Sequence, residues 1–158
     1  MKILNVIDLM NPVFGGAEER SFQMSQHLEL SGISVDLLTT KWCLDKDWVE
    51  QLEISNIYYV EAFFLRYLFP YRARKWLDNN ISNYNVIHIS KNWSILAYLA
   101  AKAARKHNIP YVFSGMGFVS IHNRSKFLKS LYLRYISIPI IKNANACIAV
   151  TQEEKEDL

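Results

Sequence analysis

The chain has 158 residues, of which 51% are hydrophobic and 21% are charged. This length fits one domain, and this composition is ordinary for a soluble globular protein. The formal net charge of +3 is too small to indicate a nucleic-acid-binding protein, in which a concentrated basic face is expected.

The predicted elements alternate between short apolar runs and longer amphipathic stretches. Runs of strand length that are rich in β-branched residues predict strands, at 2–8, 33–40, 57–60, 85–90, 111–114 and 146–150. Between them, the spacing of apolar residues predicts helices, at 17–30, 63–80, 93–107 and 124–143. We expect Pro70 to break the second helix and Pro139 to bend or end the fourth, because proline cannot continue a helix in progress.

Repeated strand–helix–strand units imply parallel strands joined by right-handed crossovers. The strands are continuous apolar runs, which is typical of a sheet with helices on both faces. The sequence therefore predicts an α/β fold, a Rossmann-like doubly wound parallel sheet, over residues 1–150. Residues 151–158 begin a further helix, because Thr151 and Glu154 match a capping box. We expect that helix to be truncated, since two turns are marginally stable alone.

The start of the chain predicts a cytosolic protein. One lysine and a short apolar stretch lead to Asp8 without a small-residue cleavage site, which argues against a signal peptide. No apolar run of the sequence approaches the ~20 residues that span a bilayer. The two cysteines, Cys43 and Cys147, have no metal-ligand spacing, and Cys147 lies in an apolar run that predicts its burial.

Gly15 and Gly16 lie where the first predicted strand passes into the first helix. Glycines at a helix N-terminus let backbone amides approach a ligand closely, because they lack a Cβ and tolerate positive φ. The alternative is that the pair only makes a tight turn between strand and helix. The long loop and the lack of a Gly-x-Gly-x-x-Gly turn argue against a dinucleotide-binding oxidoreductase.

Four motifs occur in order along the chain. They are Gly15-Gly16-Ala17-Glu18 with the segment 28–35, the strand 86–89 with Trp93, the run 109–112 leading to Met116 and Gly117, and the run 144–150 with Thr151 and Glu154. This series resembles the N-terminal domain of glycosyltransferase family 4 over nearly the whole chain. The resemblance implies one half of a GT-B fold and places the glycine loop in the cleft between the two halves.

The resemblance implies a retaining transferase that moves a sugar from a nucleotide-sugar to an acceptor hydroxyl, on a lipid-linked glycan or a cell-envelope polysaccharide. It implies no cofactor and no metal. In this family the N-terminal domain binds the acceptor, and a second domain, in cis or in trans, binds the nucleotide-sugar. We therefore expect an enzyme of the hexosyltransferase type whose 158-residue half is inactive alone. The alternative is a non-catalytic membrane-associated or protein-binding module derived from this fold.

Further candidates for the cleft follow the C-terminal ends of two predicted strands, where open α/β sheets place their ligands. They are Asn92, Trp93, Gly115, Met116, Gly117 and His122. Many relatives carry a histidine near the reacting sugar where this chain has Met116, which cannot transfer a proton. His122 could substitute, but the spacing does not require it, and no catalytic residue is assigned.

Three residues near this edge have simpler alternative roles. Asn92 suits the N-cap of the following helix, and Trp93 could be a core residue rather than a surface that stacks on a sugar ring. His88 lies within a β run, where a lone histidine is expected to be a hydrogen-bonded core residue rather than a catalyst.

The segment 63–77 combines aromatic residues with cations and contains no acidic residue. Basic helices with an aromatic face can lie in an anionic membrane interface, and the candidate contacts are Arg66, Arg72, Arg74, Lys75 and Trp76. The alternative is an amphipathic core helix whose cations are solvated. Family members that glycosylate lipid-linked acceptors dock this domain on the inner face of the cytoplasmic membrane, so the resemblance keeps membrane contact as a candidate role beside that commoner alternative.

Overall fold

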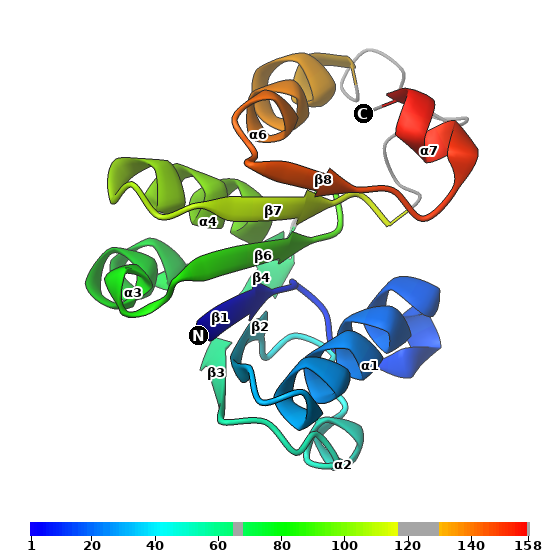
Figure 1. The fold of residues 1–158 in the computed structure, drawn as a ribbon, viewed down its shortest axis with the longest axis vertical. Coiled ribbons are helices and arrows are strands. Elements are labelled where there is room, and N and C mark those ends of the chain that lie inside the picture. Colours follow the sequence, from blue (N-terminus) through cyan, green and yellow to red (C-terminus); the bar gives the residue numbers. More distant parts are fainter. Residues whose placement is uncertain (65–67, 117–129, 158) are drawn as a thin grey trace.

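The computed structural model describes residues 1–64, 68–116 and 130–157 of the chain. In these residues, the centre of the molecule is a parallel sheet of six strands in the order β3-β2-β1-β6-β7-β8 (Figure 1). The strands are β1 Lys2–Val6, β2 Ser34–Thr40, β3 Asn56–Val60, β6 Val86–Ser90, β7 Tyr111–Ser114 and β8 Ala146–Ile148. The predicted Rossmann-like doubly wound fold is confirmed.

Helices cover both faces of this sheet, as the continuous apolar strands predicted (Figure 1). The longer helices are α1 Gly16–Leu30, α3 Ala73–Asn80 and α4 Ile95–Lys106. The shorter helical segments are η1 Pro12–Phe14, α2 Lys46–Val49, η2 Ile81–Asn83, η3 Leu133–Ser137, α6 Ile138–Lys142 and α7 Gln152–Asp157. On one face, α1 and α2 pack on Ile7 and Leu37 through Phe22 and Val49. On the other face, the alanine-rich side of α4 lies close to the buried strand residues.

The strand order creates a switch point beside β1. The chain adds β2 and β3 on one side of β1 and then crosses back, so that β6 pairs with the other side of β1. Loops that leave the carboxyl ends of β1 and β6 therefore diverge to opposite faces of the sheet. Open α/β sheets bind their ligands in the crevice that forms at such a point.

The segment 63–80 is not one helix with a break, and that expectation is wrong. Phe63–Phe64 and Leu68–Phe69 form an antiparallel hairpin, β4 and β5, and α3 begins only at Ala73. Phe63 and Phe69 face each other across the hairpin with ring centroids 5.9 Å apart. Aromatic cross-strand pairs of this kind stabilise a hairpin, and Pro70 prevents α3 from extending back into it.

Pro139 does not end the helical run, which continues without a break from η3 through α6 to Lys142. Pro139 is the second residue of α6, directly after the π-helical segment. The irregularity lies one turn earlier, in the π-helical segment η3. Residues 124–129 of the predicted helix lie outside the described residues.

The expected burial of Cys147 is also wrong, because this side chain is exposed. It lies on β8, which pairs only with β7 among the described strands and so forms an edge of the sheet.

The start of α7 is as predicted: Thr151 Oγ1 accepts a hydrogen bond from the Glu154 amide, and the Glu154 carboxylate accepts one from the amide of Val150. No helix within the described part of the chain is long and apolar enough to cross a membrane.

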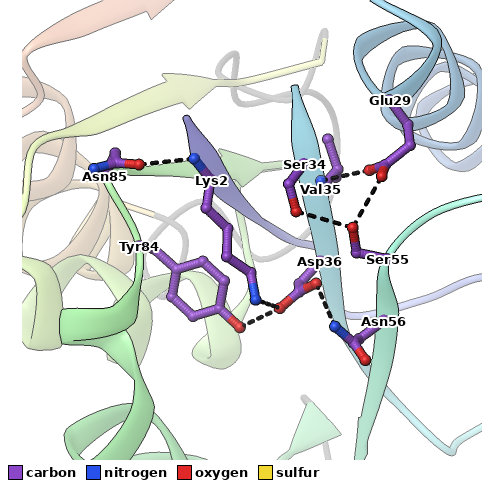
Figure 2. Close-up of polar contacts among 9 residues, drawn as sticks. All are labelled: Lys2, Glu29, Ser34, Val35, Asp36, Ser55, Asn56, Tyr84 and Asn85. Carbon is purple, nitrogen blue, oxygen red and sulfur yellow. Dashed lines mark hydrogen bonds and ion pairs between the residues drawn. The ribbon is translucent and has the colours of Figure 1, made fainter. Parts of the chain in front are cut away.

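A polar cluster closes the amino edge of the sheet (Figure 2). Asp36 is fully buried on β2. Its carboxylate accepts hydrogen bonds from Tyr84 Oη at 2.8 Å and Asn56 Nδ2 at 2.9 Å, and pairs with Lys2 Nζ at 2.8 Å. A buried charge is tolerated when its partners are in place. Both oxygens of this carboxylate are occupied, so the cluster is structural, and ligand binding must be sought at the opposite, carboxyl edge.

Candidate functional site

The glycine loop opens the carboxyl edge after β1. Asn11 caps η1 by accepting a hydrogen bond from Val13, and Gly15 then follows at φ 124° as the N-cap residue of α1. Residues with a side chain rarely adopt this conformation. Gly16 begins α1, and a Cβ at its position would meet no heavy atom within 4 Å in the described residues. Gly15 and Gly16 are exposed, so the N-terminus of α1 is accessible, as a helix N-terminus that binds an anion must be.

An ion pair ties this helix to the loop after β6. Lys91 Nζ lies 2.6 Å from Glu18 Oε1, and the two side chains are 16% and 1% exposed. The Lys91 amide also donates to the Ser114 carbonyl at 2.8 Å, which joins the ends of β6 and β7. One residue thus connects the glycine helix to two neighbouring strand ends.

Asp8 lies beside this pair, directly after β1, and is 8% exposed. Burial raises the pKa of its carboxyl, against the opposing effects of the Lys91 charge and of hydrogen bonding to Ser94. Within the described residues, its Oδ1 atom has no hydrogen-bond partner. A buried carboxylate oxygen without a partner costs free energy, and such a cost is commonly found at binding sites.

Three residues at the same edge hold strained backbone conformations. Lys91, Trp93 and Met116 have φ values of 75°, 58° and 58°. Non-glycine residues in this region cost on the order of 1–3 kcal/mol each and cluster at ligand-binding and catalytic sites. Their position at the ends of β6 and β7 marks the same edge as the glycine loop does.

The structure corrects the role of Asn92. Ser94, not Asn92, caps α4, and its Oγ accepts from the Ala97 amide at 3.2 Å. Asn92 is 2% exposed, and its Oδ1 accepts a hydrogen bond from Ser137 Oγ at 2.8 Å. It therefore fixes the loop after β6 against η3. Trp93 is half-buried, with its ring centroid 5.0 Å from that of Tyr132.

His88 is the hydrogen-bonded core residue that its β run predicts. It lies beneath the edge, where Asn5 Oδ1 is 3.0 Å from its Nδ1, and Asn5 in turn donates to Ser21 and Ser25 of α1. The pKa of His88 is lowered to about 4, because burial disfavours the charged imidazolium and Arg20 repels it. A neutral, buried imidazole with this partner is part of the core.

The remaining predicted site residues differ in burial, and three of them lie outside the described residues. Gly115 and Met116 are buried at the end of β7, whereas Gly117, His122 and Arg66 lie outside the described residues. Arg72, Arg74 and Lys75 are exposed around the start of α3. Trp76 is half-buried, with its ring 4.8 Å from the ring of Tyr58. The described edge thus brings together Gly15, Gly16, Asn92, Trp93, Gly115 and Met116.

Sequence reasoning missed Asp8 and the ion pair of Glu18 with Lys91. Glu18 had an ordinary explanation, since an acid in the first turn complements the helix dipole. A usable signal existed, because Asp8 and Lys91 are the first charged residues after two apolar strands. Among the described residues, no group of three His, Cys, Asp or Glu side chains is placed to hold a metal ion.

Solved glycosyltransferases share this fold. The Anabaena protein HepE, in complex with UDP and glucose, superposes with a TM-score of 0.73 at 17% identity, over 99% of this chain and 40% of that one. MurG from Acinetobacter baumannii superposes with a TM-score of 0.65 at 13% identity, over 96% of this chain and 42% of MurG. Arabidopsis thaliana UGT89C1, complexed with UDP, superposes with a TM-score of 0.62 at 11% identity, over 99% of this chain and 47% of UGT89C1. This chain thus spans less than half of each, and identities this low show the fold alone.

The sequence itself identifies the family. No curated protein matches the chain significantly. The family model described as Glycosyltransferase Family 4 matches residues 14–158, from the glycine loop to the last residue. The chain therefore belongs to glycosyltransferase family 4.

Proposed function

We propose that this chain forms the acceptor-side half of a retaining glycosyltransferase, which transfers a sugar from a nucleotide-sugar to an acceptor hydroxyl. The observation that carries the proposal is the open N-terminus of α1 at the switch point of a family 4 domain. HepE and UGT89C1, which share the fold, were solved with UDP, and this supports a UDP-sugar as the donor.

In the proposed reaction, a bond forms between the acceptor oxygen and the anomeric carbon of the sugar, and the bond from that carbon to the diphosphate oxygen breaks. Negative charge develops on the leaving diphosphate, and fixed amide dipoles stabilise such charge well. The Gly16 amide is suited to this role, because Gly15 and Gly16 are exposed at the N-terminus of α1. The acceptor proton leaves with the nucleotide product, and no side chain of the described edge is assigned as its carrier. The proposal includes no metal and no cofactor.

The proposal includes a second, donor-binding domain, in cis or in trans. The chain spans 40–47% of the length of the three glycosyltransferases described above, and one face of a cleft cannot exclude water from a reacting diphosphate. The acceptor is proposed to be a lipid-linked glycan or cell-envelope polysaccharide, which fits a protein held at the inner face of the cytoplasmic membrane.

Membrane contact has its own structural support. Phe63 and Phe69 of the hairpin and Tyr71 beyond it are 48%, 45% and 48% exposed. Exposed aromatic residues beside the cations Arg72, Arg74 and Lys75 suit the interface of an anionic membrane. Trp76 contributes less, since it packs against Tyr58.

The test is a substitution at Gly16 in the chain combined with a donor-binding domain. Gly16→Ala adds one methyl group at the N-terminus of α1, where a Cβ meets no heavy atom of the described residues within 4 Å. It should leave the fold intact but displace a diphosphate that approaches this backbone closely, so sugar transfer should fall by about tenfold or more. Unchanged transfer would show that the glycine loop only makes a turn.

The competing function is a non-catalytic, membrane-associated module. Met116 favours it, because this side chain cannot carry a proton. That function predicts binding to anionic vesicles that salt weakens and no transfer from any UDP-sugar when a donor-binding domain is supplied.

A further inference from the structure

A hollow that does not include the glycine loop lies between the C-terminal half of α4 and the segment η3–α6. Its volume is about 400 Å³, within the range of small-molecule sites. It opens beside Tyr111, the first residue of β7, and so lies toward the amino edge of the sheet. The proposed transferase reaction does not use it.

The lining of this hollow is cationic. Lys102, Arg105 and Lys106 come from successive turns of α4, and the described residues that line it include no acid. Lys106 is neutralised by Asp78, with Nζ 2.9 Å from Oδ1. In the described part of the chain, neither Lys102 nor Arg105 forms an ion pair with a carboxylate, although Lys102 also lines a neighbouring hollow that contains Asp78.

The dipole of α4 explains only part of this charge. Cations in the last turn of a helix complement its negative end, and Arg105 and Lys106 lie there. That end carries only roughly half a unit of negative charge. Lys102 lies a turn earlier, with its Nζ 5.8 Å from the centroid of the Tyr98 ring.

Aromatic and aliphatic groups form the rest of the wall. Tyr98 and Tyr111 lie on one side, and Ile136, Pro139 and Ile140 lie on the other. The Tyr111 hydroxyl donates to the Ile140 carbonyl, which fixes α6 against β7. Arg105 and Tyr111 also line an adjoining hollow of about 420 Å³. Arg105 thus lies where the two hollows meet. Burial raises the pKa of Tyr111 to about 12, and the positive charge of Arg105 acts against this shift.

We propose that this hollow binds a phosphate group carried on an aromatic or apolar molecule, with Arg105 and Lys102 as the anion-binding residues. A planar guanidinium pairs with two phosphate oxygens at once, and an ammonium beside it adds a point charge. A phosphate monoester carries about −1.5 to −2 charges at pH 7, which matches these two cations better than one carboxylate does. The apolar wall receives the body of the ligand.

The test is an NMR titration of the 158-residue chain with phenyl phosphate, with phenol and inorganic phosphate as partial ligands. Amide shifts should concentrate in α4 and α6, and phenyl phosphate should bind more tightly than either partial ligand. Arg105→Gln should weaken its binding by about tenfold, the effect of one charge-assisted hydrogen-bonded contact. The matched control is Lys142→Gln, which removes the same charge from an exposed residue of α6 outside the lining and should change affinity less than about twofold.

Equal weakening by Arg105→Gln and Lys142→Gln, shifts spread over all basic surfaces, or binding of phenol as tight as that of phenyl phosphate would each overturn the proposal. A second arm separates the two sources of such a group. Vesicles of phosphatidylcholine with phosphatidic acid that compete with phenyl phosphate, and lose binding in Arg105→Gln, identify a lipid headgroup. Failure of the vesicles to compete identifies a soluble phosphate ester. Both variants replace exposed residues, so equal thermal midpoints will show that the fold is retained.

Discussion

Lys91 Nζ lies 2.6 Å from Glu18 Oε1 and closes the space between the glycine helix and the strand ends of β6 and β7. The pair joins residues 73 positions apart in the sequence. It also holds Lys91 in a left-handed conformation that a lysine does not adopt without support. The ion pair and the strained backbone therefore depend on each other.

Removing one partner of this pair should destabilise the fold strongly. Lys91→Met leaves the Glu18 carboxylate buried without its counter-charge, and we expect the free energy of unfolding in urea to fall by about 3 kcal/mol. The double variant Glu18→Gln with Lys91→Met should recover most of this loss, because it removes the carboxylate that the single variant leaves without its ion-pair partner; Asp8 loses the nearby Lys91 charge in both variants. A double variant as unstable as the single one would show that packing, not charge, holds the loop.

The two glycines should respond oppositely to alanine. Gly15→Ala places a side chain at φ 124° and should cost on the order of 1–3 kcal/mol of unfolding free energy. Gly16→Ala lies in the first turn of α1 with open space around it, and should be neutral or stabilising by about 0.5 kcal/mol. Urea titrations of both variants measure this, and a large loss at Gly16 would mean that its Cβ meets something the described residues do not include.

His88 should make stability depend on pH on the acidic side. Its pKa is about 4 in the folded chain, against 6.5 for an ordinary histidine. The neutral imidazole therefore contributes fully to the free energy of unfolding above pH 6.5, and this contribution is lost as the pH falls toward about 4. The full difference corresponds to about 3 kcal/mol. Between pH 7 and pH 4.5, the free energy of unfolding should decrease less for His88→Asn than for the natural chain, as measured by urea titration at each pH. Parallel decreases in the two proteins would place the dependence on other groups.

The hairpin should carry membrane contact. Replacing both Phe63 and Phe69 by serine removes exposed apolar area, and vesicle affinity should fall by about tenfold, as expected for losing on the order of 1–2 kcal/mol of apolar burial. Leu30→Ser is the control, since Leu30 is 73% exposed at the end of α1, on the other face of the sheet. Co-sedimentation with phosphatidylserine vesicles measures both, and equal losses would contradict a specific contact at the hairpin.

The sequence predicted the fold from local patterns. Buried parallel strands leave apolar runs that are hard to mistake, and their alternation with helices leaves few topologies. The errors came from tertiary effects. The segment 63–69 has helix-like spacing but pairs as a hairpin through Phe63 and Phe69, and Cys147 lies in an apolar run that falls at an edge of the sheet.

The position of the candidate residues at the carboxyl edge of the sheet could be predicted, because glycines and strand ends have local signatures. Gly15, Trp93 and Met116 could be placed at one edge from the parallel order of the strands alone. The partner of Lys91 could not be found in this way, because an ion pair between Glu18 and Lys91 depends on how α1 lies over the strand ends. The same holds for Asn92, whose partner Ser137 comes from the last third of the chain.

We propose above that this chain supplies one half of a transferase cleft. The most direct measurement is sugar transfer from UDP-sugars to a lipid-linked glycan acceptor, by the chain alone, by a donor-binding domain alone and by the two together. We expect transfer only when both halves are present, and transfer reduced by about tenfold or more when Gly16→Ala replaces the natural chain. Transfer by the chain alone, or none by the two halves together while vesicle binding persists, would contradict it.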